Sequence, residues 1–287
     1  KPIFRRGFLG VGDWKVNKIT VSGSNVEKVI VSKPTEGKKT FKFYPTEDRA
    51  KLGLKLGEVD KLINIFNPEP FDAWKTLNIE KEIDTQKLVV VFFNNGKEKI
   101  TADKTLRQAL TYAVDKERFT GKRAVSPISP DSWAYNPQVK PYNYDPQRSK
   151  ELIKELPKEI QNNLFLNIAS TPVLLNDAEL IAKNWRDIGV KVNVQVTSGI
   201  PEDFDVFLAI LDIPKDPDQY SLWHSSQETS NIANYKNPRI DKLLEDGRTV
   251  INESERKKIY LDFQRFLVED SPAAFLYHPV SYTIIRK

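Results

Sequence analysis

The stretch "LFLNIASTPVLLNDAELIAKNWRDIGVKVNVQV", residues 164–196, decides the fold because it contains one complete unit of a parallel sheet. It begins with a short apolar run, continues with Ile181, Trp185 and Ile188 at helical spacing, and ends with alternating valines. Gly189 stands where a glycine commonly terminates a helix. Strand, helix and strand in this order predict a right-handed crossover, and therefore two parallel strands with Trp185 in the core beside them.

A third strand of the same sheet is predicted at residues 204–211, "FDVFLAIL", which are apolar except for Asp205. Asp212 follows this run directly, and a polar loop that contains Asp216 and Asp218 comes after it. In open α/β sheets, ligands bind at the carboxyl ends of the strands. We therefore expect Asp212 to lie where a ligand is held.

Strand and helix patterns continue on both sides of this unit. Strand patterns cover residues 18–33, which predict a hairpin, and residues 40–44, 87–95 and 280–287. Helical patterns cover residues 46–57 and 102–119, and further helices begin at Asp145-Pro146 and Asn237-Pro238. A last helix carries Ile259, Phe263 and Phe266 as its predicted core face, and residues 124–144 predict no regular structure.

The composition is that of a globular protein, and it excludes several kinds of chemistry. Of 287 residues, 39% are hydrophobic and 29% are charged, with 44 basic and 39 acidic side chains interspersed along the chain. Because no basic segment stands out, we expect no nucleic-acid partner. The chain has no cysteine and two histidines, so we expect neither a metal centre nor a cofactor. No apolar run reaches the roughly 18 residues that a membrane-spanning helix needs.

The carboxylates of the polar loop leave several functions open. Asp212, Asp216 and Asp218 could supply the acid and the base of a hydrolase, hold a cationic ligand, or form a solvated loop. No G-x-S-x-G motif is present, and His224 has no partner at a fixed spacing that would indicate a nucleophile. The sequence Asp-Pro-Asp also lacks the spacing of an EF-hand calcium loop.

Aromatic side chains outside the predicted core faces favour a ligand pocket. Trp133 and Tyr135 lie in the irregular segment, and Tyr220 and Trp223 lie in the loop after Asp212. Aromatic walls beside a few carboxylates suit an organic ligand that carries an amine. We predict these four residues as ligand contacts, together with Asn94 at the end of a buried apolar run.

Seven stretches of the chain, in order, resemble motifs of the family 5 extracellular solute-binding proteins, the peptide- and nickel-binding subunits of ABC importers. They are "LGVGDWKV" (9–16), "FYPTEDRAKLGLKLGEVD" (43–60), "KTLRQALTYAVDKERF" (104–119), "YDPQRSKELIKE" (144–155), "WRDIGVKVNVQV" (185–196), "DPDQYSLWHSSQ" with "NIANYKNPRIDKLL" (216–244), and "ERKKIYLDFQRFLVEDSPAAFLY" (255–277). Family members are longer than this chain. Peptide-binding members often have a tryptophan in the strand before the ligand aspartate, where this chain has Ala209.

The resemblance implies an α/β fold of the two-lobed periplasmic-binding-protein type, class II. Residues 1–98 would form part of a mostly β first lobe. Residues 99–280 would form an α/β second lobe that contains the strand–helix–strand unit. Residues 281–287 would form a strand that returns toward the first lobe.

The resemblance also implies a function. The expected protein is a non-enzymatic, monomeric solute-binding protein that captures an oligopeptide-like ligand in an interlobe cleft for an ABC permease. By position, Asp212 matches the aspartate that holds the α-amino group of a bound peptide in oligopeptide-binding members, whereas Asp216-Pro217-Asp218 is expected to be a structural turn. The expected location is the periplasm or the cell surface, with a lipoprotein anchor in a preceding segment. A carboxylate-dependent hydrolase and a ligand-free interaction module are the alternatives.

Overall fold

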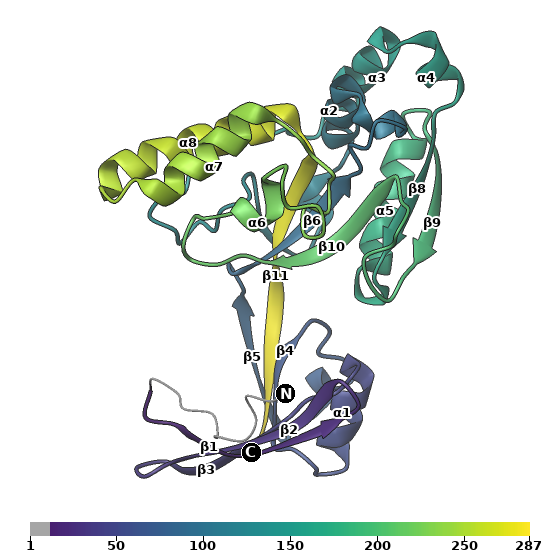
Figure 1. Ribbon diagram of the computed structural model, residues 1–287. Coiled ribbons are helices and arrows are strands. Elements are labelled where there is room, and N and C mark those ends of the chain that lie inside the picture. Colours follow the sequence, from purple (N-terminus) through teal and green to yellow (C-terminus); the bar gives the residue numbers. More distant parts are fainter. Residues whose placement is uncertain (1–11) are drawn as a thin grey trace. The chain divides into compact units, whose positions relative to one another are not determined.

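The computed structural model describes residues 12–287, which divide into two compact units (Figure 1). Within the described residues, unit 1 consists of residues 12–81 and Ser281–Lys287, and unit 2 of Glu82–Val280. The chain passes between the units in β5 (Leu77–Ile83) and in β11 (Ala273–Arg286). Residues 9–11 of the first family-like motif lie outside the described residues.

Unit 1 begins with a three-stranded antiparallel sheet that contains the predicted hairpin. Its strands are β1 (Lys15–Ser22), β2 (Asn25–Lys33) and β3 (Gly37–Lys42), in that order across the sheet. Gly23 has φ +59° in the turn between β1 and β2, a conformation that glycine adopts without strain.

A helix and a short strand complete unit 1. Helix α1 (Glu47–Lys55) begins at Thr46, whose side chain accepts a hydrogen bond from the Arg49 backbone N–H, and ends before Gly57, which has φ +73°. Strand β4 (Lys61–Ile65) pairs antiparallel with the end of β11, and Phe71–Ala73 form a 3₁₀ turn. The core of unit 1 is formed by Leu54, Leu62, Ile65, Phe71, Leu77 and Ile284.

Unit 2 is built on a mixed sheet in which β6 (Lys87–Phe93) and β10 (Val206–Asp212) lie at the centre. The strand order is β11-β6-β10-β8-β9, with β8 at Phe165–Ser170, β9 at Lys191–Val196, and β7 (Gly121–Arg123) paired with β11. Strands β8 and β9 are parallel, and β10 is parallel to β8, so the predicted strand–helix–strand unit and its third strand are confirmed. Strand β6 is antiparallel to both β10 and β11.

Helices and loops cover both faces of this sheet. The helices are α2 (Lys104–Tyr112), α3 (Pro146–Glu155), α4 (Lys158–Asn162), α5 (Leu175–Arg186), α6 (Tyr220–Trp223), α7 (Pro238–Thr249) and α8 (Glu253–Asp270). The 3₁₀ turns of unit 2 are Ile100–Ala102, Lys116–Arg118 and Pro172–Leu174. Helices α2 and α5 contribute to one hydrophobic cluster, and α6, α7 and α8 contribute to the other together with residues 124–144. Helices α7 and α8 lie side by side (Figure 1).

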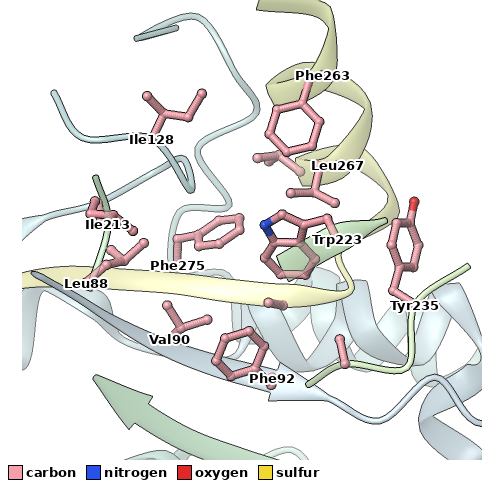
Figure 2. Packing of buried hydrophobic residues seen from close by; sticks show 14 of the residues in the cluster. Leu88, Val90, Phe92, Ile128, Ile213, Trp223, Tyr235, Phe263, Leu267 and Phe275 are labelled. Carbon is pink, nitrogen blue, oxygen red and sulfur yellow. The ribbon is translucent and has the colours of Figure 1, made fainter. Parts of the chain in front are cut away.

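Strand β6 belongs to both clusters because its side chains alternate between the two faces. Val89, Val91 and Phe93 join the cluster with α2 and α5, whereas Leu88, Val90 and Phe92 join the other, where Figure 2 shows them beside Phe275 and Trp223. Burial on both faces is what an uninterrupted apolar run predicts for a central strand. The predicted core position of Trp185 is confirmed as well, since this residue is fully buried and its Nε1 donates to the Leu110 carbonyl.

The predicted core face of the last helix is partly wrong. Phe263 is fully buried, but its buried neighbours are Tyr260 and Leu267, whereas Ile259 and Phe266 are only partly buried. Two cations lie close to the Phe266 ring, with the guanidinium carbons of Arg239 and Arg265 at 3.2 and 4.2 Å from its centroid. Cation–π contacts stabilise the part of this ring that the core leaves uncovered.

Phe92 gives a direct test of the central core. The substitution Phe92→Ala should lower the free energy of unfolding of unit 2 by about 3–5 kcal/mol, because it removes a buried ring and leaves a cavity. Phe165→Ala on β8 is the matched control, since Phe165 is 48% exposed and should lose less than about 1.5 kcal/mol. Urea unfolding followed by tryptophan fluorescence measures both, and equal losses would contradict the packing described.

Candidate functional site

Asp212 is the last residue of β10, and it lies beside the first residue of the neighbouring strand β6. In the antiparallel register Asp212 lies directly opposite Lys87, and one further bond, from the Ile213 N–H to the Gln86 carbonyl at 2.7 Å, continues the ladder. Lys87 Nζ donates to Asp212 Oδ1 at 2.6 Å. The Asp212 side chain is 85% exposed and the Lys87 side chain 21%, so this carboxylate faces solvent with one cation beside it.

The pair opens into a depression of about 490 Å³ on unit 2. Its lining consists of Asp84, Gln86, Lys87, Asp212, Ile213 and Pro214. A tight turn shapes one wall, because the Lys87 N–H donates to the Asp84 carbonyl at 3.1 Å and the Gln86 N–H donates to Asp84 Oδ1 at 3.0 Å. A carboxylate and an ammonium side by side can bind a ligand that carries a positive group close to an oxygen acceptor.

His278 on β11 lies behind Lys87. Its Nδ1 is 2.8 Å from the Lys87 carbonyl, which only accepts hydrogen bonds, so Nδ1 carries the proton. Burial lowers the pKa of His278, and the nearby Lys122 lowers it further, while the Lys87 carbonyl, Asp131 and Asp84 act in the opposite direction. The imidazole is therefore held neutral behind the Asp212–Lys87 pair at neutral pH.

The four aromatic residues predicted as ligand contacts do not line this depression. Trp223 is fully buried, its ring centroid lies 5.9 Å from that of Phe92, and its Nε1 donates to Gln219 Oε1 at 2.9 Å (Figure 2). Tyr220 stacks on His224 with centroids 4.0 Å apart. Trp223 is therefore a core residue, and the contact of Tyr220 with His224 stabilises the loop.

Trp133 and Tyr135 are partly buried in the irregular segment 124–144. The Trp133 ring meets Tyr260 edge to face at 6.4 Å, and the Arg256 guanidinium lies 5.5 Å from its centroid. Desolvation raises the pKa of Tyr135 above its ordinary value. Trp133 thus connects the irregular segment to α8.

Asn94 lies at the other end of β6 from Lys87 and is buried. Its Nδ2 donates to the Phe204 carbonyl at 2.9 Å. Its Oδ1 accepts from the Gly96 N–H and from Asn234 Nδ2, each at 3.0 Å. The Asn94 amide therefore ties three loops together at the far end of the β6–β10 pair.

The predicted structural turn at Asp216 and Asp218 is present. Asp216 accepts two hydrogen bonds from Arg256 at 3.0 Å and one from the Asp218 N–H at 2.9 Å. Asp218 accepts from the Tyr220 N–H at 3.0 Å and from Arg248 Nε at 2.8 Å. The hydrogen bonds from Arg256 hold the pKa of Asp216 below its usual value. Both carboxylates therefore fasten the loop to α7 and α8.

The chain belongs to the bacterial extracellular solute-binding proteins, family 5, whose middle-region model matches residues 31–231. It is 28% identical to the oligopeptide-binding protein AppA of Bacillus subtilis (strain 168), over 84% of this chain and 50% of that protein. It is 29% identical to heme-binding protein A of Haemophilus influenzae, over 70% of this chain and 41% of that protein. The chain spans about half the length of the curated relatives it matches.

Solved structures confirm the predicted fold class, the α/β fold of two-lobed periplasmic binding proteins. NikZ from Campylobacter jejuni in complex with Ni(L-His) matches with a TM-score of 0.83 and 25% identity, over 96% of this chain and 62% of that one. DppA from Helicobacter pylori in complex with the peptide STSA matches with a TM-score of 0.78 and 24% identity, over 96% of this chain and 59% of that one. In residues 12–287, no helix has the length and apolar character needed to cross a membrane.

Sequence reasoning missed Lys87 as a partner of Asp212. The two residues are 125 positions apart, and only the register of β6 against β10 brings them together. A signal was present, since one apolar run begins at Lys87 and the other stops at Asp212, which has the opposite charge. An antiparallel pairing of the two runs would have joined them.

The pH dependence of stability tests the surroundings of His278. Because the folded state holds the pKa of His278 below the unfolded value of 6.5, the unfolded state binds the proton first as the pH falls. The free energy of unfolding should therefore fall, relative to that of a His278→Gln variant, as the pH decreases from 7 to 5. The difference should change by at most about 1.4 kcal/mol per pH unit. Urea titrations at several pH values measure it, and a gap that stays constant would contradict a buried neutral imidazole.

Proposed function

We propose that this chain is the ligand-capturing part of a solute-binding protein whose solute is an oligopeptide-like molecule with a free α-amino group. The observation that carries the proposal is the Asp212 carboxylate, which ends a central strand, is exposed, and borders a depression on unit 2. Relatives named as oligopeptide-binding and dipeptide-binding proteins support the choice of a peptide.

In this proposal Asp212 is the counter-charge for the ligand's ammonium group. An ion pair that stays in water contributes only about 0–1 kcal/mol. Binding must therefore also exclude water from the carboxylate, because a desolvated, hydrogen-bonded charge pair contributes several kcal/mol. The exposed ring of Pro214 in the lining beside Asp212 suits such a water-poor contact.

The cellular location, the transport partner and the division into lobes belong to the same proposal. We place the protein outside the cytoplasmic membrane, in the periplasm or at the cell surface with a lipid anchor, as a monomer that delivers its solute to an ABC permease. We assign unit 1 to one lobe and unit 2 to the other, so residues 82–98, which the resemblance placed in the first lobe, go with the second because β6 is a central strand of its sheet. We assign the other five predicted contacts, Trp133, Tyr135, Tyr220, Trp223 and Asn94, a supporting role, because each has contacts of its own within unit 2, through the backbone N–H in the case of Tyr135.

The hydrolase alternative has less support. The relatives are solute-binding proteins and not enzymes. A carboxylate-dependent hydrolase also needs a second carboxyl group free to exchange protons beside the first. The oxygens of Asp216 and Asp218 accept hydrogen bonds from Arg256 and Arg248 and from the turn's own backbone instead.

The substitution Asp212→Asn tests the proposal on the full-length natural protein. It should leave the fold intact, since the side chain is exposed and nearly unchanged in shape. It should weaken the binding of the tripeptide Ala-Ala-Ala by about 2–5 kcal/mol, the range for removing one partner of a buried charge pair. N-acetyl-Ala-Ala-Ala has no ammonium group, so its affinity should change far less. Calorimetric titration measures both peptides.

Asp203→Asn is the matched control. Asp203 precedes the other end of β10, is 84% exposed, and also pairs with a lysine, Lys99, at 2.7 Å. Its substitution removes the same charge and should change peptide affinity by less than about 0.5 kcal/mol, as surface substitutions usually do. Equal losses for the free and the acetylated peptide, or for the two variants, would refute the assignment of Asp212.

A further inference from the structure

The ammonium group of Lys87 already occupies the place beside Asp212 that a ligand ammonium would take. The distance from Lys87 Nζ to Asp212 Oδ1, 2.6 Å, is that of a direct charge-assisted hydrogen bond. The pair is fixed by the backbone, because Lys87 and Asp212 are opposite each other in the β6–β10 register. A ligand amine that approaches Asp212 Oδ1 therefore competes with Lys87.

A second lysine–aspartate pair in unit 2 shows what is special about Lys87. Lys99 pairs with the exposed Asp203 at 2.7 Å, but it also pairs with Asp205 at 3.1 Å, whose side chain is 17% exposed. Lys99 would thus keep a counter-charge if Asp203 were taken away. Within residues 12–287, Lys87 forms an ion pair with Asp212 alone. Once a ligand takes Asp212, the Lys87 ammonium needs a new acceptor.

We propose that Lys87 and Asp212 together recognise an α-aminoacyl group, that is, an ammonium group and the neighbouring carbonyl or carboxylate of one ligand residue. This inference rests on the proposed function. The ligand's ammonium displaces Lys87 from Asp212, and Lys87 then donates to the carbonyl or carboxylate oxygen of the same ligand residue. In such a group the nitrogen and the oxygen are roughly 3 Å apart, as standard bond lengths dictate. This spacing fits two protein groups that are themselves in contact.

Two opposing contributions to ligand affinity decide whether Lys87 strengthens or weakens binding. Freeing Asp212 from an exposed ion pair costs a factor of up to about five in affinity. A hydrogen bond from an ammonium to a ligand oxygen contributes a factor of about ten to one hundred. Lys87 therefore favours ligands with an oxygen next to the amine, and it disfavours ligands in which the amine stands alone or farther away.

Two isomeric tripeptides test this on the full-length natural protein. Ala-Ala-Ala and β-Ala-Ala-Ala have the same mass and charge, but in the second the amine is one carbon farther from the first carbonyl. The unsubstituted protein should bind Ala-Ala-Ala at least about tenfold more tightly. In Lys87→Met, Ala-Ala-Ala should bind about tenfold more weakly and β-Ala-Ala-Ala equally or up to about fivefold more tightly, so that the preference disappears.

Further variants separate this role from a general effect of charge or folding. Lys87→Arg keeps a cation with donors and should retain most of the preference, whereas Lys87→Gln should lose most of it. Lys242→Met removes a lysine that pairs with Asp246 at 2.8 Å on α7, and it should leave the preference unchanged.

The outcomes also distinguish the two proposals. If the unsubstituted protein binds neither tripeptide, the proposed function fails and the role of Lys87 fails with it. If both bind and Asp212→Asn weakens them, but Lys87→Met leaves their affinity ratio unchanged, only the role of Lys87 is refuted. A ratio near one in the unsubstituted protein refutes it as well.

Discussion

The antiparallel register of β6 and β10 is the constraint on which the rest of unit 2 depends. Residues 87–93 of β6 pair with residues 206–212 of β10 without a shift. Because side chains alternate along a strand, a slip of one residue would exchange the side chains of β6 between the two hydrophobic clusters. The same register that separates the clusters also places Lys87 opposite Asp212. Core packing and the chemistry at the strand end are therefore consequences of one pairing.

The two ends of this strand pair are built differently. At the end where β10 begins, buried or half-buried groups are joined by many bonds: Asn94 ties loops together, and Asp205 accepts from Lys99 and from the backbone N–H of Asn167. At the end where β10 stops, Asp212 is exposed and has one cation beside it. Groups whose hydrogen-bonding capacity is used within the fold rigidify a structure, whereas an exposed carboxylate with a single weak partner can exchange that partner for a ligand.

Local features of the fold follow from the sequence because they depend on neighbouring residues. Thr46, Asp145 and Asn237 each begin a helix, as their side chains and the following residues predict, and Gly57 and Gly189 have positive φ where helices end. The buried strand β6 is predicted from its apolar run alone. The parallel unit at residues 164–196 is predicted because strand, helix and strand leave few ways to connect.

Features that depend on distant residues were harder to derive from the sequence. The spacing of apolar residues on α8 did not show that Phe266 would be only partly buried, with Arg239 from another helix over its ring. Trp223 looked like a loop aromatic, but α6 buries it against Phe92 and Phe275. The position of Asp212 at the end of a strand was predicted from the apolar run before it. Its partner Lys87 was not, because strand register is a property of the folded sheet.

The double burial of β6 has a consequence for how ligand capture would be observed. A strand with neighbours on both edges and apolar cover on both faces exchanges its amide protons only through large openings of the domain. The displacement of Lys87 from Asp212 needs no such opening, since side-chain rotamers change within nanoseconds while the backbone stays in place. Hydrogen exchange in β6 would therefore report the overall stabilisation by a bound ligand, but it would not resolve the displacement of Lys87. Side-chain probes, such as the ammonium resonance of Lys87, would record it.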